Sequence, residues 1–380
     1  MNIAVPKQIQ PGETRVPLTP AVVKKFVAMG VQVQIDPGAG LASAANDQDY
    51  LDAGATLSTD GSLWSNANLV ITLEPPGLEQ AKKIKPDAVL IGLLAPLAQA
   101  ELIGVLCENK VTSFAMEFLP RISRAQSMDV LSSQASIGGY KAALLAAEHC
   151  PKMMPMMITA AGTLAPGRIF VIGAGVAGLQ AIATGKRLGA VVEAFDVRSV
   201  TKEQIQSLGA RFVELPTTGQ DDQATGGYAK EQTDEERQKQ SALMSRHVIG
   251  ADAVISTAAV FGKAPPILIP ADTVGQMKPG SVIVDLAANI EYSHGNCECT
   301  KPGQTYTTDN GVVIIGETNL PTLLPLSASQ VYANNMHAFC SEIIEDGHLK
   351  LNLDDEIQNT AAITHDGQIV NDMVREAIGS

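Results

Sequence analysis

The sequence predicts an α/β protein with two Rossmann-like, doubly wound parallel-sheet domains separated by a cleft. Short apolar runs alternate with longer amphipathic stretches along the chain, which is typical of βαβ units. The chain has 380 residues, more than one hydrophobic core usually organises, so two domains are expected. A glycine-rich turn at residues 173–178, between an apolar run and an amphipathic stretch, adds the pattern of a nucleotide-binding βαβ unit.

The first domain is predicted from five apolar runs, each of a length that suits a strand in a parallel sheet. These strands are expected at Asn2–Val5, Val31–Ile35, Leu69–Thr72, Val89–Leu93 and Val111–Ala115. A helix is expected at Pro20–Met29, because Thr19 can cap it, Pro20 suits its first turn and Gly30 can end it. We expect this domain to contain residues 1–128 and about 325–380, by analogy with two-domain α/β proteins whose final segment returns to the first domain.

The second domain, residues 129–324, is predicted from six further apolar runs. Its strands are expected at Arg168–Ile172, Val191–Phe195, Arg211–Val213, Ala253–Ser256, Ser281–Asp285 and Val312–Gly316. An alanine-rich helix at Asp129–Cys150 is expected to connect the domains. The polar stretch at residues 216–240, with paired glycines, is predicted to be a mobile loop before a charged helix. A solvated insertion and a lid over a bound cofactor fit this stretch equally well.

The composition argues against several classes of partner and site. The formal net charge of −13 would repel phosphate backbones, so no nucleic acid partner is expected. The five cysteines are odd in number and scattered, which argues against a disulfide framework and indicates the reducing cytoplasm. Cys297 and Cys299 lie close together, but no second pair or histidine cluster completes four ligands, so no metal site is expected.

The most informative motif is the glycine-rich turn, in which Gly173, Gly175 and Gly178 form the pattern G-x-G-x-x-G. The first glycine permits a tight strand-to-helix turn, the second lets the backbone approach a pyrophosphate, and the third allows close packing of helix on strand. The following helix presents free N–H groups and the positive end of its dipole to phosphates. With a strand before it and a second strand after the helix, the motif predicts an NAD(H) site.

Asp196 ends that second strand, where the dinucleotide-binding pattern places an acid that accepts hydrogen bonds from the adenosine ribose. A carboxylate here would repel a 2′-phosphate, so NAD is expected rather than NADP. Arg198 leaves three roles open, since it can hold a phosphate, pack against adenine or pair with a carboxylate.

A second group of polar residues lies at residues 120–142, between the two predicted sheets. Arg121 and Arg124 offer hydrogen-bond donors, Gln126 offers a donor and an acceptor, and Asp129 can pair with an arginine or cap the next helix. From the residues alone, a network at a helix entry and a pocket for nicotinamide both remain open.

The chain resembles the soluble NAD(H)-binding component (domain I, from the alpha subunit) of the proton-translocating nicotinamide nucleotide transhydrogenase. The segments that carry this resemblance run nearly end to end: PRISRAQSMD, LSSQ, GAGVAGLQAIATGKRLGA, GGYAKE, GKAPPILI, MKPGSVIVDLA and GNCE. The resemblance implies direct hydride transfer between NADH and NADP⁺, with NADP(H) held by a partner beta subunit. It also implies a homodimer, a small transmembrane subunit that belongs to the proton path, and a peripheral place on the cytoplasmic face of the inner membrane.

The resemblance also assigns residues. It implies that Arg121, Gln126, Asp129 and Ser132 form the loop that meets the nicotinamide and its ribose, with Ile122 and Ser123 in the same segment. Further cofactor contacts are implied at Val176, Asp196, Val197, Arg198, Gly227, Tyr228, Gln240 and Ala259. At Ala259 the family usually has a larger apolar residue.

Two other functions are compatible with the nucleotide motif. Alanine dehydrogenase is a related family that shares the segment ETRVPLTP, which includes Arg15. That enzyme needs general acid–base chemistry, and the resemblance places its lysine and histidine where this chain has Leu73 and the strand LIGLLAPLA, which contains Leu93. Hydride exchange between two nicotinamides moves no proton on nitrogen or oxygen, so positioning alone suffices. The second alternative is a binding module that senses NADH.

Overall fold

The computed structural model describes residues 1–214, 234–259 and 262–379, and it shows two compact units. Unit 1 contains residues 1–134 and 322–380, and unit 2 contains residues 135–321. Each unit has a mainly parallel sheet, so the predicted two-domain α/β class is confirmed. None of the helices in the described ranges is long and apolar enough to cross a membrane.

The sheet of unit 1 has eight strands in the order β19-β18-β6-β5-β4-β1-β2-β3. Six neighbouring strands, β1 to β6, are parallel to one another, whereas β18 and β19 add to one edge in antiparallel pairings. The bounds of these strands are β1 (Asn2–Val5), β2 (Gln32–Ile35), β3 (Thr56–Leu57), β4 (Leu69–Ile71), β5 (Val89–Gly92), β6 (Thr112–Ala115), β18 (Ala362–His365) and β19 (Gln368–Ile369).

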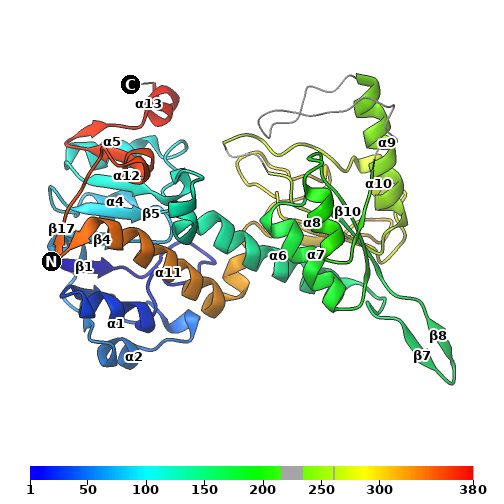
Figure 1. Cartoon of the computed structure of the whole chain (residues 1–380), viewed down its shortest axis with the longest axis horizontal. Helices are drawn as coiled ribbons and strands as arrows, with labels where there is room; N and C mark the ends of the chain where they lie inside the picture. Colours follow the sequence, from blue (N-terminus) through cyan, green and yellow to red (C-terminus); the bar gives the residue numbers. More distant parts are fainter. Residues whose placement is uncertain (215–233, 260–261, 380) are drawn as a thin grey trace. The chain divides into compact units, whose positions relative to one another are not determined.

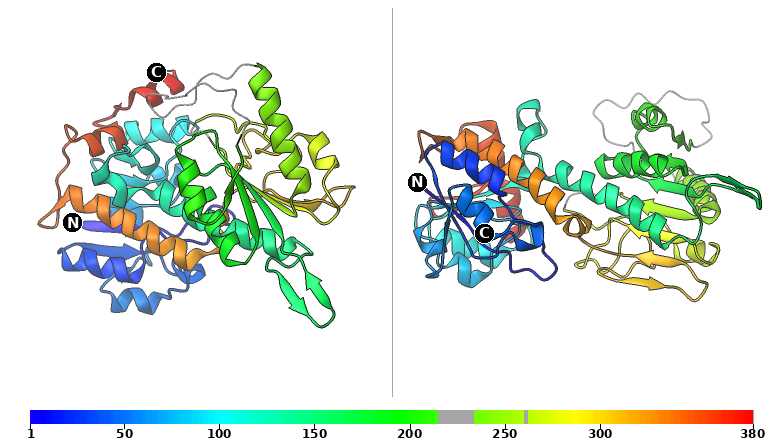
Figure 2. Two further views of the ribbon diagram at one scale, coloured as in Figure 1. Left: turned by 45° about the vertical axis from the view of Figure 1, so that its right-hand side comes forward. Right: turned by 90° about the horizontal axis from the view of Figure 1, so that it is seen from below.

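Helices cover both faces of this sheet, as a doubly wound fold requires (Figure 1). In β1, Ile3 and Val5 pack on one face while Ala4 packs on the other, because successive side chains of a strand alternate. The first face is covered by α1 (Pro20–Ala28), α2 (Asp47–Asp52), α11 (Pro325–Ile343) and α12 (Glu356–Ala361). The second face is covered by α3 (Leu63–Asn66), α4 (Leu78–Ala81), α5 (Ala100–Glu108) and α13 (Asp372–Ile378). Figure 2 shows α11 beside α1, although the two helices are far apart in the sequence.

The sheet of unit 2 has seven strands in the order β11-β10-β9-β12-β13-β15-β14. All neighbours are parallel except β14 and β15. The bounds are β9 (Arg168–Ile172), β10 (Val191–Phe195), β11 (Arg211–Phe212), β12 (Ala253–Ser256), β13 (Val282–Asp285), β14 (Thr305–Thr307) and β15 (Val313–Ile315).

One face of this sheet packs on α6 (Val130–His149), α7 (Val176–Arg187) and α8 (Thr201–Ser207), and the other packs on α9 (Asp234–Gly250) and α10 (Ala271–Gly275). A hairpin of β7 (Met157–Thr159) and β8 (Gly162–Leu164) projects away from the unit 2 sheet (Figure 1). The remaining short elements are η1 (Leu41–Ser43), η2 (Met116–Phe118), η3 (Ser123–Met128), η4 (Leu320–Leu323) and the hairpin β16 (Ile344–Glu345) with β17 (His348–Leu349).

Most expected strands agree with the structure to within one residue at each end, but three expectations need correction. The side chain of Thr19 makes no capping hydrogen bond, so α1 starts with Pro20 alone as its favourable residue. The loop expected at residues 216–240 is too long, because α9 already begins at Asp234. The segment DEERQKQ is rich in strong helix formers, and its early acids suit the helix dipole. The short edge strands, such as β3 and β19, were not expected.

Candidate functional site

The glycine-rich turn lies at the switch point of the unit 2 sheet. From β9 the chain builds outward through β10 and β11 on one side, and then through β12 and β13 on the other. The loops that leave the carboxyl ends of β9 and β12 therefore run in opposite directions, which opens the crevice in which doubly wound folds bind ligands.

Each glycine of the turn has the conformation or space that its expected role needs. Gly173 has φ +92°, which favours glycine. A Cβ at Gly178 would stand 1.9 Å from the carbonyl oxygen of Gly173, so helix and strand approach as closely as they do only without a side chain. A Cβ at Gly175 would meet nothing within 4 Å, which leaves open space where a pyrophosphate would approach the backbone.

The N-terminus of α7 is suited to an anion. Gly175 is its N-cap and has no side chain to bond the free N–H groups, and the first turn contains no acidic residue. Lys186 and Arg187 occupy the last turn, where positive charge suits the helix dipole. The unpaired N–H groups of the first turn are thus free to bind phosphate oxygens.

Asp196 stands directly after β10 and is 8 % exposed. Its Oδ2 accepts a hydrogen bond from the backbone N–H of Ala174 at 2.7 Å, inside the glycine-rich turn. Its Oδ1 accepts one from the backbone N–H of Arg198 at 2.8 Å. The Arg198 side chain adds one bond to each oxygen, at 3.0 Å from Nε and 3.0 Å from Nη2. Of the three roles that the sequence leaves open for Arg198, the structure shows the pairing with a carboxylate.

These donors set the charge of Asp196. Burial acts to raise the pKa of its carboxyl, but the Arg198 guanidinium and the two backbone N–H groups outweigh burial, so the pKa lies below its usual value. Asp196 is therefore ionised at neutral pH. Beside it, Val197 is 57 % exposed, and Val176 at the start of α7 is 42 % exposed, so both present apolar surface along the edge of the crevice.

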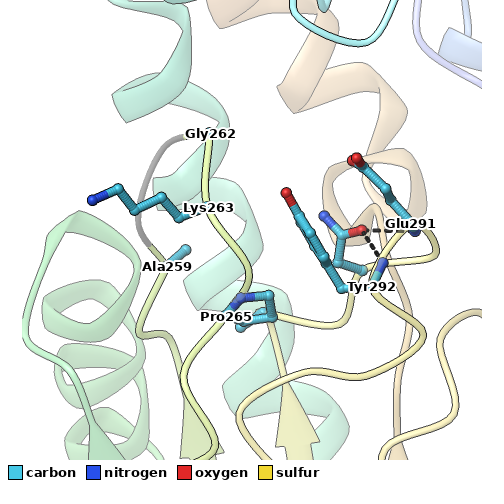
Figure 3. A pocket seen from close by; sticks show the side chains of 8 residues that line it. Ala259, Gly262, Lys263, Pro265, Glu291 and Tyr292 are labelled. Carbon is cyan, nitrogen blue, oxygen red and sulfur yellow. Dashed lines mark hydrogen bonds between the residues drawn. The ribbon is translucent and has the colours of Figure 1, made fainter.

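A pocket of about 190 Å³ lies on the other side of β9, at the carboxyl ends of β12 and β13. Figure 3 shows it between the segment from Ala259 to Pro265 and the segment that holds Glu291 and Tyr292. The expected contact residue Ala259 lines this pocket. The pocket lies on the opposite side of the glycine-rich turn from Asp196, as the far half of a dinucleotide would require.

Two residues that the sequence did not indicate hold this edge in place. Asn296 is fully buried, and its amide bonds the backbone of Ala258 in both directions, at 2.9 and 2.8 Å, and the carbonyl of Pro266 at 2.9 Å. The Thr257 hydroxyl bonds the carbonyl of Gly173 at 3.1 Å. Asn296 lies in the segment GNCE, but no residue pattern shows that its partners come from the loop after β12.

The segment at residues 120–132 belongs to unit 1 and holds the predicted nicotinamide loop. Arg121 and Gln126 are exposed, and their side chains make no hydrogen bond or ion pair with any described residue. Arg124 is different, since it pairs with Asp355 and lies 3.8 Å from Glu342. Its guanidinium is thus committed to unit 1. Ser123 is exposed, and Ile122 packs at the margin of the unit 1 core.

Asp129 and Ser132 are bonded to each other at the start of α6. The two Asp129 oxygens accept hydrogen bonds from the backbone N–H of Ser132 at 2.9 Å and from its hydroxyl at 2.6 Å. This is the geometry of a residue that caps a helix, so the capping role left open by the sequence is present. A contact of this pair with nicotinamide stays a prediction.

Three expected contacts cannot be placed. Gly227 and Tyr228 lie outside the described residues. Gln240 belongs to α9, but its side chain is not among those described. No group of three or more His, Cys, Asp or Glu side chains that could hold a metal occurs in the described ranges.

The positions that would carry amino-acid chemistry are filled by packing residues. Leu73 is fully buried in the unit 1 core, and Leu93 packs against the same core. Arg15 is 4 % exposed and bonds Glu13 through Nε at 2.8 Å and Gln134 through Nη1 at 2.9 Å. The Arg15 guanidinium is therefore committed to protein partners.

Comparison with known proteins identifies the relatives of this chain. Residues 4–138 match the family model "Alanine dehydrogenase/PNT, N-terminal domain", and residues 142–372 match its C-terminal counterpart. The first of the separate chains that make up the NAD(P) transhydrogenase alpha subunit of Rhodospirillum rubrum is 43% identical over 98% of each chain. A crystal structure of transhydrogenase from Sinorhizobium meliloti has a TM-score of 0.85 and 38% identity, and covers 98% of this chain and 100% of its own. An alanine dehydrogenase of Halomonas elongata is 29% identical over 100% of this chain and 97% of its own.

Proposed function

Since the chain belongs to the alanine dehydrogenase/PNT family, we propose that it is the NAD(H)-binding alpha subunit of a proton-translocating NAD(P) transhydrogenase. In the proposed reaction, a hydride leaves C4 of NADH on this chain and joins C4 of NADP⁺ on a partner subunit. NADH is oxidised to NAD⁺, NADP⁺ is reduced to NADPH, and no proton is transferred to oxygen or nitrogen.

The observation that carries this proposal is the full-length similarity to transhydrogenase alpha subunits, at 43% identity against 29% for an alanine dehydrogenase. The structure adds a chemical reason. An amino-acid dehydrogenase needs a general acid–base group beside the hydride path, whereas Leu73 and Leu93 pack in the core and Arg15 is held by Glu13 and Gln134. Hydride exchange between two nicotinamides needs only that the two rings are positioned.

The proposed roles follow from the charges and free groups of the site. The first turn of α7 holds the pyrophosphate, and the ionised Asp196 accepts hydrogen bonds from the adenosine ribose. Arg121 and Gln126 offer free donors, so we assign them to the nicotinamide carboxamide and its ribose. Asp129 and Ser132 hold the start of α6 directly after this segment and thereby fix its position.

We further propose that the protein is a homodimer that works with an NADP(H)-binding beta subunit and a small transmembrane subunit. Through these partners it would lie on the cytoplasmic face of the membrane and couple hydride transfer to proton movement. The β7–β8 hairpin supports a partner surface, because Met156, Ile158 and Leu164 are 60 %, 72 % and 48 % exposed. Grouped apolar side chains of this size on a projecting hairpin favour burial against another chain.

The experiment mixes the purified full chain with a purified NADP(H)-binding transhydrogenase component, NADPH and the acetylpyridine analogue of NAD⁺. We expect reduction of the analogue only when both proteins are present. NADH oxidation by this chain alone with pyruvate and ammonium would instead indicate an alanine dehydrogenase. Tight NADH binding without turnover in either assay would indicate a sensing module, and both results would overturn the proposal.

A further inference from the structure

The Asp196 carboxylate has no lone pair left for a ligand in this structure. Oδ1 accepts from the backbone N–H and the Nε of Arg198, and Oδ2 accepts from the backbone N–H of Ala174 and the Nη2 of Arg198. A carboxylate offers about four lone-pair sites, two on each oxygen. The four donors lie at 2.7 to 3.0 Å, so all four sites are occupied.

We propose that Arg198 is a positioning and specificity-determining residue that competes with the adenosine ribose of NAD(H) for the Asp196 carboxylate. This inference rests on the proposed function, because it requires that NAD(H) binds at the glycine-rich turn. Binding then exchanges the two guanidinium bonds for bonds from the ribose 2′- and 3′-hydroxyls.

The two kinds of donor differ in what they contribute. The backbone N–H groups of residues 174 and 198 hold one oxygen each, and they remain whatever side chain stands at position 198. These two bonds alone orient the carboxylate. The guanidinium fills the second site on each oxygen, and the Arg198 side chain is 45% exposed, so it can leave toward solvent. Its departure frees one site on each oxygen, which matches the two hydroxyls of a ribose.

Arg198 also changes the choice between NADH and NADPH. An ionised Asp196 repels a 2′-phosphate, and the adjacent guanidinium offsets this repulsion and can bind the phosphate. Without Arg198, NADH gains two unoccupied acceptor sites, while NADPH loses its only cation beside the carboxylate and meets the full repulsion. Arg198 therefore lowers both the affinity for NADH and the selectivity against NADPH.

The test measures dissociation constants of NADH and NADPH for the full-length wild type, Arg198→Ala, Arg198→Lys and Arg211→Ala. Arg211 is the matched control, since it is an exposed arginine that pairs with a carboxylate, Glu193, at 3.3 Å on the same sheet. For Arg198→Ala we expect NADH to bind roughly 3- to 10-fold more tightly, from hydrogen bonds to a charged acceptor less the cost of ordering. NADPH should bind several-fold more weakly.

Arg198→Lys should give a smaller gain for NADH, because one ammonium cannot fill a site on both oxygens as the guanidinium fork does. Arg211→Ala should change neither constant. The gain should vanish with an NADH analogue that has 2′-deoxyadenosine, which lacks one of the two hydroxyls. A general loosening of the fold would not distinguish this analogue from NADH.

Unchanged or weaker NADH binding by both Arg198 variants would overturn the inference, since it would mean that the guanidinium contacts the cofactor rather than competing with it. This result differs from a failure of the proposed function, in which the wild type itself would not bind NADH. Circular dichroism of each variant shows whether it is folded, and the lysine variant keeps the test valid should the alanine variant not fold.

Discussion

Glu117 lies in η2, just before the segment that holds the predicted nicotinamide loop, and its burial makes the stability of unit 1 depend on pH. Its Oε1 accepts hydrogen bonds from the backbone N–H groups of Leu94 and Ala95, at 2.9 and 2.6 Å. The residue as a whole is partly exposed, but its Oε2 is buried and has no hydrogen-bond partner among the described residues. Burial raises the pKa of this carboxyl from 4.5 to about 7, against the opposing effect of the backbone N–H groups.

The sign of the effect follows from linkage. A carboxyl whose pKa is higher in the folded than in the unfolded chain binds its proton more tightly in the folded state. The stability that this proton gives is complete below pH 4.5 and is lost progressively as the pH rises to about 7. A shift from 4.5 to about 7 corresponds to about 3 kcal/mol, at 1.36 kcal/mol for each pH unit.

Glu117→Gln tests this account, because the amide oxygen keeps the two backbone hydrogen bonds and cannot ionise. We expect the variant and the wild type to have nearly the same free energy of unfolding at pH 4.5. At pH 8 the variant should be more stable by up to about 3 kcal/mol. Glu79→Gln is the control, since Glu79 is exposed and Lys82 lowers its pKa.

The assay is urea unfolding followed by the fluorescence of Trp64, which is the only tryptophan of the chain and belongs to α3 of unit 1. The signal therefore reports on the unit that contains Glu117. An equal effect of Glu117→Gln at pH 4.5 and pH 8 would refute the reasoning, because it would show that the carboxyl does not titrate in this range.

Three further predictions concern the site and the proposed dimer. Gly175→Ala should leave thermal stability within a degree or two but weaken NADH binding at least roughly tenfold, since its methyl group enters the open space of the pyrophosphate; Gly178→Ala should lower the melting temperature as well, because its Cβ would collide with the Gly173 carbonyl. Melting curves and NADH titrations separate the two, and equal stability losses would contradict this reasoning. Gln126→Ala should spare NADH binding severalfold more than transhydrogenation with the partner component, and equal losses would refute its role beside the nicotinamide. Ile158→Asp, on the exposed β7–β8 hairpin, should shift the protein from dimer toward monomer in sedimentation, and an unchanged dimer would remove the hairpin from the proposed interface.

The strands of both sheets could be predicted because they are buried on both faces. Ile3, Ala4 and Val5 all pack in one of two cores, so the sequence reads as a continuous apolar run with no polar alternation. The edge strands could not be predicted in this way. Those at the margins, such as Thr56–Leu57 and Gln368–Ile369, have two residues and owe their conformation to a neighbouring strand rather than to their own pattern.

The glycine-rich turn was equally accessible from sequence, because its roles depend on missing side chains and local backbone geometry. Interactions between distant segments were not accessible. Arg121 and Arg124 look equivalent in the sequence, yet Arg124 pairs with Asp355, far along the chain, and Arg121 pairs with no described residue. The unpartnered oxygen of Glu117 and the amide of Asn296 belong to the same class, since tertiary packing alone decides what surrounds them.

The central claim is direct hydride transfer from a nucleotide on this chain to a nucleotide on a partner. The most direct test uses NADH with two deuterium atoms at C4, the full chain, NADP⁺ and the NADP(H)-binding component in ordinary water. Mass spectrometry of the NADPH formed should find one deuterium in every molecule, because the hydride never exchanges with solvent. NADPH without deuterium would contradict direct transfer, since it would show that the hydride passes through a group that exchanges with water.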